Sequence, residues 1–108
     1  MATRTETCGN TEYTLAPMRA GQLRDLHVMR LESPTRTFMD DNLYTVACTL
    51  MNADKERGFP GKPFDEYIVC AENIPLTEYD EVLKLANSVS GFIVKAKKLG
   101  EEKATDQQ

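Results

Sequence analysis

The sequence predicts a mainly α-helical small domain, with three to four helices and a short β-strand or hairpin near its N-terminus. Three observations predict this class. Apolar residues recur at three- and four-residue intervals over most of residues 20–93, as in helices with one buried face. Breaks rich in proline and glycine divide that stretch into pieces of helical length. Only residues 11–18 alternate apolar and polar side chains as a strand does.

The chain is expected to form one domain between two polar ends. At 108 residues it is long enough for a modest hydrophobic core. Residues 1–10 are rich in threonine and are assigned to a flexible N-terminal arm. Residues 11–94 are assigned to a single helical domain. Residues 95–108 are strongly charged and are assigned to a flexible C-terminal tail.

The first predicted element is a strand before Pro17. Tyr13 and Leu15 alternate with polar neighbours, and the proline closes the segment. One strand cannot stand alone, so it must pair with another strand, lie on helices or extend a partner's sheet. The sequence leaves open whether residues 13–16 pair within one subunit or between subunits.

The first predicted helix covers residues 20–31. Leu23 and Leu26 fall on one side of it, and Met29 extends this apolar stripe. Ser33-Pro34 ends the helix, because the residue before a proline is driven out of the α region.

The second predicted helix has the most regular pattern in the chain. It starts near residues 35–37 and ends before Gly58, a candidate C-cap. Asp40 and Asp41 lie near its start, where the helix dipole favours negative charge. Its apolar stripe comprises Met39, Leu43, Val46, Ala47, Leu50 and Met51.

Two further helices follow a loop at residues 58–63. A short helix from residue 63 to about 72 is predicted from the spacing of Phe64, Tyr67, Ile68 and Ala71. A buried strand over residues 67–71 is the alternative, because this segment contains β-branched side chains. Thr77 is the predicted N-cap of the last helix. Gly91 either ends that helix or kinks it.

Composition and charge exclude several classes of function. Thirteen Lys and Arg against seventeen Asp and Glu give a formal net charge of −4, which argues against binding to nucleic-acid phosphates. No apolar run approaches the ~18 residues of a membrane span. The polar N-terminus carries no visible secretory signal. We therefore expect a soluble intracellular protein without a membrane or nucleic-acid partner.

No catalytic motif, cofactor motif or metal-ligand pattern is present in the sequence. The spacing of Cys8, Cys48 and Cys70 fits neither a disulfide framework nor a zinc site. Cys48 and Cys70 lie in apolar stretches and are interpreted as buried thiols. A cysteine nucleophile with His27 as its base is the alternative. The acidic pairs at residues 40–41 and 80–81 are interpreted as charges at helix starts rather than as acid–base or Mg²⁺ groups.

The order of the segments, over residues 12–93, resembles the small tail assembly chaperones of long-tailed bacteriophages and prophages. The resemblance rests on the strand-like Tyr13-Thr14-Leu15-Ala16-Pro17-Met18 and the segment Arg19–Leu26, on a helix ending near Leu50-Met51-Asn52-Ala53, and on the step Ile74-Pro75-Leu76-Thr77-Glu78-Tyr79 into a helix ending Val89-Ser90-Gly91-Phe92.

This resemblance implies a protein that is not an enzyme and has no cofactor. Members of the family bind the long helical tape-measure protein and keep it soluble until tail-tube subunits polymerise around it. They self-associate and are absent from the finished virion. The implied partners are therefore the tape-measure protein, the tail-tube protein, a frameshifted longer form of the chain and further copies of the chain itself. The implied location is the cytoplasm of the bacterial host.

The residues expected to contact a partner lie where apolar stripes or elements end. They are Leu26 and Met29 on the first helix, and Phe92 and Ile93 after the last one. Two alternative functions remain at this point. One is another small phage structural protein, such as a head–tail connector or a minor tail component. The other is a thiol-dependent enzyme that uses one of the cysteines.

Overall fold

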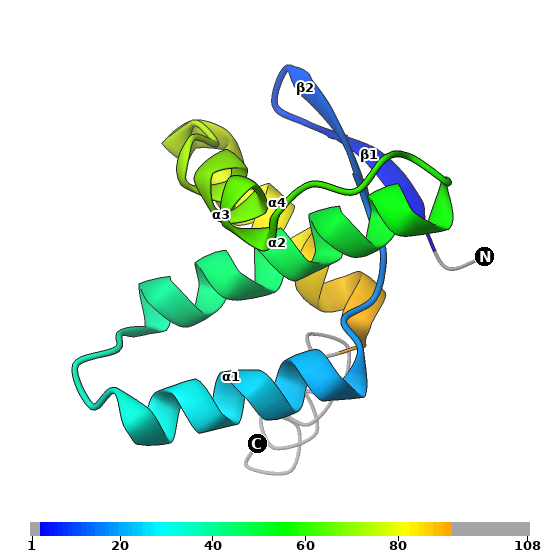
Figure 1. The fold of residues 1–108 in the computed structure, drawn as a ribbon. Coiled ribbons are helices and arrows are strands. Elements are labelled where there is room, and N and C mark those ends of the chain that lie inside the picture. Colours follow the sequence, from blue (N-terminus) through cyan, green and yellow to red (C-terminus); the bar gives the residue numbers. More distant parts are fainter. Residues whose placement is uncertain (1–2, 92–108) are drawn as a thin grey trace, which may run out of the picture.

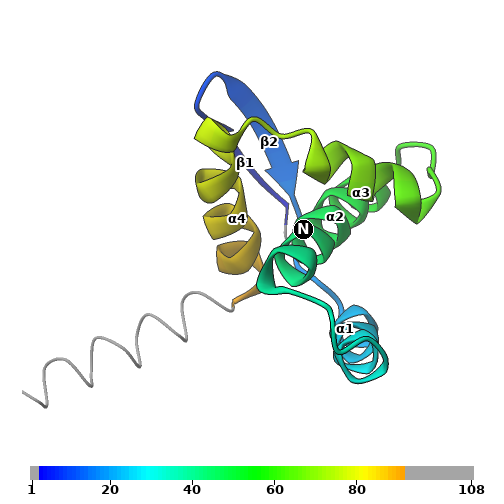
Figure 2. The ribbon, with the colours of Figure 1, turned by 90° about the vertical axis from the view of Figure 1, so that its left-hand side faces the viewer.

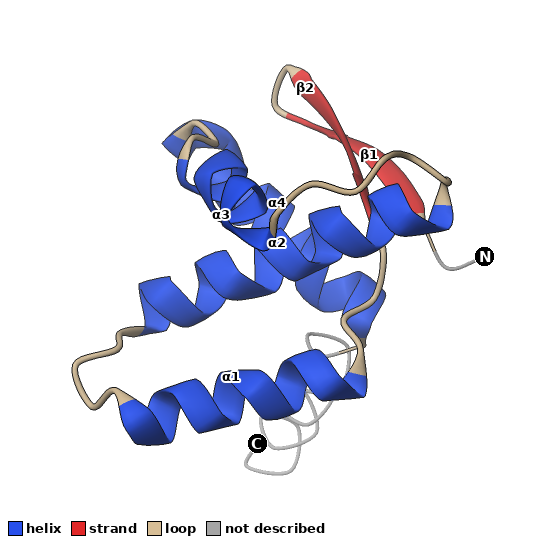
Figure 3. Ribbon diagram, in the orientation of Figure 1, coloured by secondary structure: helices blue, strands red, loops and turns tan. Residues whose placement is uncertain are grey.

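In the computed structural model, which describes residues 3–91, a β-hairpin precedes four helices (Figure 1). This arrangement, coloured by secondary structure in Figure 3, confirms the predicted mainly-α class with an N-terminal β element. The tail assigned to residues 95–108 lies outside the described residues. The elements in chain order are β1 (Arg4–Cys8), β2 (Thr11–Leu15), α1 (Ala20–Glu32), α2 (Phe38–Glu56), α3 (Phe64–Glu72) and α4 (Leu76–Ser90).

The hairpin corrects the prediction of a flexible arm at residues 1–10. β1 and β2 pair antiparallel, from Arg4 opposite Leu15 to Cys8 opposite Thr11. Gly9 has a φ of 63°, which suits the tight turn between the strands. The strand was missed because four of the five β1 side chains face water, so its sequence lacks the alternation that marks a half-buried strand. Residues 13–15 thus pair with β1 of the same chain.

Glu78 of α4 holds the hairpin in place. Its carboxylate accepts hydrogen bonds from the Tyr13 hydroxyl at 2.8 Å, from the Asn10 backbone N–H at 3.2 Å and from the Thr11 hydroxyl at 3.3 Å. The Tyr13 bond is the main reason why the pKa of Glu78 lies below its usual value. Burial, and then the bond to this carboxylate, raise the pKa of Tyr13 to about 12. An isolated two-stranded hairpin is marginal in water, so this connection positions it.

The core forms where α2, α4 and the hairpin meet. Figure 2 shows α4 on one side of α2 and α3 on the other. The backbone N–H of Ala16, just after β2, donates to the Thr49 carbonyl of α2 at 3.0 Å and ties the hairpin to the same centre. The buried cluster consists of Cys8, Leu15, Val46, Ala71, Tyr79, Val82, Leu85 and Ala86.

The helix boundaries resolve the alternatives that the sequence left open. Residues 67–71 are helical, so the strand alternative is wrong. The last helix is capped by Pro75 and not by Thr77, which lies inside its first turn. Gly91 has a φ of 85° and ends α4 in the left-handed conformation, which a glycine adopts without steric cost.

Helix α1 lies at the edge of the domain. In Figure 2 it is seen below α2, apart from the hairpin and α4. Leu26 is its one buried residue, at 5% exposure, and α1 packs against α2. A helix with so small a buried face depends on polar contacts at its ends to hold its position.

Candidate partner-binding site

A groove opens where α1, α2 and α3 come together. Its apolar wall is formed by half-buried side chains from all three helices, and its volume is about 340 Å³. Met29 comes from α1, Leu43 and Tyr44 from α2, and Phe64 and Ile68 from α3. We call this the three-helix groove. The rings of Tyr44 and Phe64 meet across it with centroids 5.3 Å apart and planes tilted by 59°, a favourable arrangement for two aromatic rings.

The rim of the three-helix groove is acidic. It carries Asp40, Asp65, Glu72 and one cation, Arg36. Arg36 already pairs with Asp41 through its Nε at 2.8 Å. Asp40 accepts a hydrogen bond from the Thr37 backbone N–H at 2.9 Å and so caps α2. Asp65 and Glu72 are exposed and form no hydrogen bond or ion pair within residues 3–91. The groove therefore presents uncompensated negative charge beside an apolar wall.

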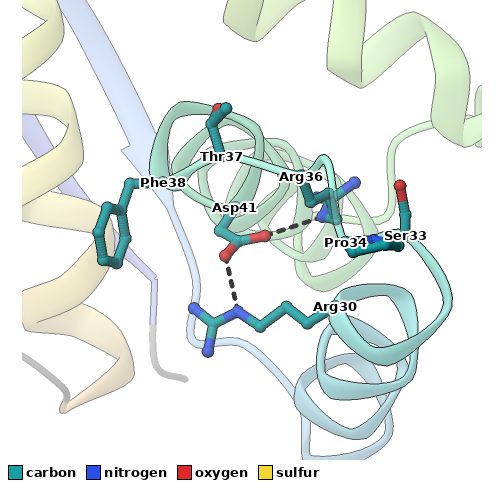
Figure 4. Close-up of a pocket in the computed structure, with 7 residues that line it drawn as sticks. All are labelled: Arg30, Ser33, Pro34, Arg36, Thr37, Phe38 and Asp41. Carbon is teal, nitrogen blue, oxygen red and sulfur yellow. Dashed lines mark hydrogen bonds and ion pairs between the residues drawn. The ribbon is translucent and has the colours of Figure 1, made fainter.

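One end of α1 is fixed by a buried carboxylate (Figure 4). Asp41 of α2 accepts hydrogen bonds from Arg30 Nε at 2.6 Å and from Arg36 Nε at 2.8 Å. Burial alone would raise the pKa of the Asp41 carboxyl, but the hydrogen bonds and positive charges of the two arginines hold it below its usual value. Because Arg30 is one residue from Met29, this contact sets the distance between the α1 wall of the groove and α2.

The other end of α1 is fixed by a buried amide. Asn52 of α2 is 2% exposed and donates to the Pro17 carbonyl and to the Gln22 side chain, each at 2.8 Å. The hydroxyl of Tyr44, whose ring lines the groove, donates to the Gln22 backbone carbonyl at 3.3 Å. Polar contacts at both ends thus compensate for the small apolar interface of α1.

A second groove, between β2, α2 and α3, differs in its charge balance. It has a similar volume of about 340 Å³ and is lined by two acidic and two basic residues, Glu12, Asp54, Arg57 and Lys62. Asp54 forms an ion pair with Arg57 at 2.9 Å and accepts a hydrogen bond from the Tyr67 hydroxyl at 2.8 Å. Lys62 lies 5.8 Å from the centre of the Tyr67 ring. Its acidic and basic residues balance in number, so it is a weaker candidate for a charged partner.

The four residues expected to contact a partner differ in where the structure places them, and two of them lie outside the residues it describes. Met29 lines the three-helix groove. Leu26 is buried at 5% exposure on the side of α1 that packs against α2, so it is not open to a partner in this structure, and the predicted partner contact there stays a prediction. It is the one buried residue of α1, on the helix that packs against α2. Phe92 and Ile93 lie outside the described residues.

Sequence reasoning missed Leu43, Tyr44, Phe64 and Ile68 as groove residues. A usable signal was present in the third helix. Its apolar stripe is wider than the core requires, and the structure buries only Tyr67 and Ala71 from it. The surplus side chains of that stripe form the groove wall.

Within residues 3–91 seven large apolar side chains are exposed, and none of them lines this groove. Leu31 and Phe38 are 85% and 83% exposed at the two ends of the α1–α2 connection. Figure 4 shows the Phe38 ring pointing away from Asp41 and the arginines. The others are Val28, Met39, Phe59, Val69 and Leu76.

The cysteines are placed only partly as expected. Cys48 is buried, and burial raises its pKa to about 11. Cys8 is also buried, and burial raises its pKa too. Cys70 is exposed, which corrects the prediction of a buried thiol, because the core side of α3 is taken by Tyr67 and Ala71. Raised pKa values disfavour the reactive thiolate at the two buried positions.

Within residues 3–91 no cluster of three or more His, Cys, Asp or Glu side chains is arranged to bind a metal ion. None of the helices described there combines the length and apolarity that a bilayer span requires. Comparisons with protein-family models, curated proteins and solved structures give no match for this chain.

Proposed function

We propose that this protein is a tail assembly chaperone of a long-tailed phage or prophage, which binds the tape-measure protein and keeps it soluble. The observation that carries the proposal is the three-helix groove, an open apolar surface built by three separate helices. The resemblance in segment order supports the assignment to the tail assembly chaperones. The groove supports it as well, because it is an apolar surface that a client helix could contact. The proposed place of action is the cytoplasm of the bacterial host, before the tail is complete.

The chemistry of the groove suits transient shielding. A free tape-measure chain exposes apolar helical stripes, which aggregate when they meet one another. An amphipathic client helix would place such a stripe against Met29, Phe64 and Ile68, which are partly open to water in the free protein. Burying one large apolar side chain contributes ~1.5–3 kcal/mol. Association costs at least ~4 kcal/mol, so a groove of this size gives weak contacts. Many weak contacts along one client permit release when tube subunits replace the chaperone.

The proposal is tested by co-expression with the tape-measure protein of the phage or prophage that carries the gene for this chain, scored by the fraction of that protein that stays soluble. Ile68→Asp places a charge in the groove and should abolish the solubilisation. Val69→Asp is the matched control, because Val69 is the next residue of α3, is 52% exposed and lies outside the groove. Met29→Asp and Val28→Asp form a second matched pair on α1.

Circular dichroism should show that all four variants are folded. If both groove variants solubilise the client as well as their neighbours do, the groove is not the client surface. Mass spectrometry of purified virions separates the proposal from a connector or minor tail component. A chaperone should be missing from the particle, whereas a structural component would be present in a constant copy number.

A further inference from the structure

A positively charged cleft at the connection between α1 and α2 is the least explained feature of the domain. It is formed by the last turn of α1, the connection and the first turns of α2, and its volume is about 340 Å³. We call it the α1–α2 cleft. Arg30 and Arg36 line it on either side of Asp41, so positive charge exceeds negative charge by one (Figure 4). The whole chain has a net charge of −4, and one arginine is enough to neutralise Asp41. Neutralising that carboxylate therefore does not account for the second arginine.

Both arginines keep donors that Asp41 does not use. Asp41 accepts one hydrogen bond from the Nε atom of each, at 2.6 Å and 2.8 Å. Within residues 3–91 the two guanidinium groups form no other hydrogen bond, which leaves their terminal Nη groups for a ligand. Two Nη groups side by side present parallel N–H donors, a geometry that binds both oxygens of a carboxylate. Figure 4 shows the tip of Arg30 pointing away from Asp41, toward the side of the cleft where the Phe38 ring lies. The Arg30 side chain is 46% exposed, so a ligand in solution can reach it.

Large apolar side chains stand beside this cation. Phe38, the first residue of α2, lines the cleft and is 83% exposed, and Pro34 lines it from the connection. Leu31 directly follows Arg30 and is 85% exposed. Neither Phe38 nor Leu31 belongs to the hydrophobic core. Arginine and aromatic side chains are both enriched at the centres of protein–protein contacts. The surroundings of Arg30 therefore suit a protein segment better than a small ion.

The charge of the cleft suits a carboxylate better than a phosphate group. A phosphate group carries about −1.5 to −2 charges at pH 7, which exceeds the surplus positive charge and would face the Asp41 carboxylate. Phosphate sites at helix starts also use free backbone N–H groups. Here the N–H of Asp40 donates to the Thr37 hydroxyl at 3.3 Å, and that of Asp41 donates to the Thr37 carbonyl at 3.2 Å. A carboxylate carries a single negative charge and balances the surplus.

We propose that the α1–α2 cleft binds an acidic segment of another protein, in which a carboxylate side chain is followed by large apolar side chains. The carboxylate accepts hydrogen bonds from the Nη groups of Arg30, and the apolar side chains pack on Phe38, Pro34 and Leu31. This surface shares only Arg36 with the three-helix groove. The inference does not rest on the proposed function, because it concerns a different surface and a differently charged partner.

A peptide with a single carboxylate tests the chemistry of the cleft. The probe is Gly-Ser-Glu-Phe-Leu-Ser-Gly with both ends blocked, and the measurement is a two-dimensional NMR titration of the full chain. Backbone amide signals of residues 30–41 should shift as peptide is added. Replacing the glutamate of the peptide by glutamine should weaken binding about tenfold, because it removes one charge-assisted contact. Non-specific attraction should contribute little, because peptide and protein are both negatively charged.

Two pairs of protein variants locate the contact. Arg30→Gln should weaken peptide binding about tenfold. Arg24→Gln is its matched control, because Arg24 belongs to the same helix, is 75% exposed and lies outside the cleft. Phe38→Ser should weaken binding about fivefold, from part of the contact of one large apolar side chain. Leu76→Ser is the control for it, because Leu76 is the first residue of α4, is 81% exposed and lies outside the cleft.

Phe38→Ser keeps the test valid even where Arg30→Gln loosens the Asp41 contact, because the Phe38 ring points away from that carboxylate. Thermal melts should show that all four variants are folded at the temperature of the titration.

Equal binding of the glutamate and glutamine peptides would overturn the inference. So would peptide binding that neither Arg30→Gln nor Phe38→Ser weakens, or shifts that fall outside residues 30–41. Sodium phosphate is titrated in parallel. If phosphate shifts the signals of residues 30–41 and the peptide does not, the cleft is a phosphate site and the proposed partner is wrong. None of these outcomes affects the proposed function, which is tested separately by Ile68→Asp in the three-helix groove.

Discussion

Replacing Asp41 by asparagine should destabilise the domain by about 2 kcal/mol, a value between two limits. Removing one partner of a fully buried ion pair costs ~3–5 kcal/mol, whereas an exposed pair contributes ~0–1 kcal/mol. The Asp41 side chain is 10% exposed, but those of Arg30 and Arg36 are 46% and 20% exposed. The carboxylate is therefore buried while water still solvates the guanidinium groups in part. Asparagine keeps the shape of the side chain and removes its charge.

The measurement is thermal or urea unfolding followed by circular dichroism. For a domain of this size, about 2 kcal/mol corresponds to a fall in Tm of ~8–16 °C. Asp25→Asn is the matched control, because Asp25 pairs with Arg24 where the two side chains are 56% and 75% exposed. That substitution should cost less than about 0.5 kcal/mol. Hydrogen exchange in the Asp41 variant should quicken first in α1, whose contacts with the rest of the domain run through α2.

The effect of Asp41 should depend on pH with a definite sign. Its pKa is lowered in the folded state, so the ionised carboxylate is the stabilising form. Its contribution is complete above the unfolded pKa, ~3.9, and is lost as the pH falls through the lower folded value. Wild type and Asp41→Asn should therefore converge in stability at strongly acidic pH. A difference below about 0.5 kcal/mol at pH 7, or one unchanged at pH 2, would refute the assigned role of this ion pair.

Two further predictions concern the hairpin and the thiols. Gly9→Ala should cost about 2–3 kcal/mol in unfolding experiments, because a Cβ there would lie 2.6 Å from an α4 side chain at a φ of 63°. Gly58→Ala also has a positive φ, 74°, but meets open space, so a loss near 1 kcal/mol is expected. Equal losses would show that the contact with α4 does not restrict the turn. In a thiol-labelling assay Cys70 should react in the native protein, and Cys8 and Cys48 only after unfolding. Rapid labelling of a buried thiol would contradict the packing described here.

Local sequence signals were sufficient for the helices. Their apolar spacing and their breaks identified all four, because helix periodicity and the effects of proline and glycine act over a few residues. The same signals failed for β1. Its side chains are mostly exposed, and its stability comes from β2 and from Glu78, which is more than sixty residues away in the chain. A strand of this kind has no local pattern by which to recognise it.

For the candidate site, too, the sequence predicted some residues correctly and could not predict the accessibility of others. Met29 was identified from the sequence as the end of an apolar stripe, and it lines the three-helix groove. Leu26 lies on the same stripe and is buried, because α1 needs one apolar residue against α2. Periodicity identifies which face of a helix is apolar, but it does not say which residues of that face remain accessible after packing.

The sequence by itself determined the mainly helical class, the approximate helix boundaries and the apolar face of each helix, because these depend on neighbours three and four residues apart. Only the tertiary structure decided that Asp41 binds two arginines, that Glu78 holds the hairpin and that side chains from three helices form one acidic-rimmed groove. Each of these features joins residues from different elements. Their distances are set by how the elements pack, which no local pattern of residues encodes.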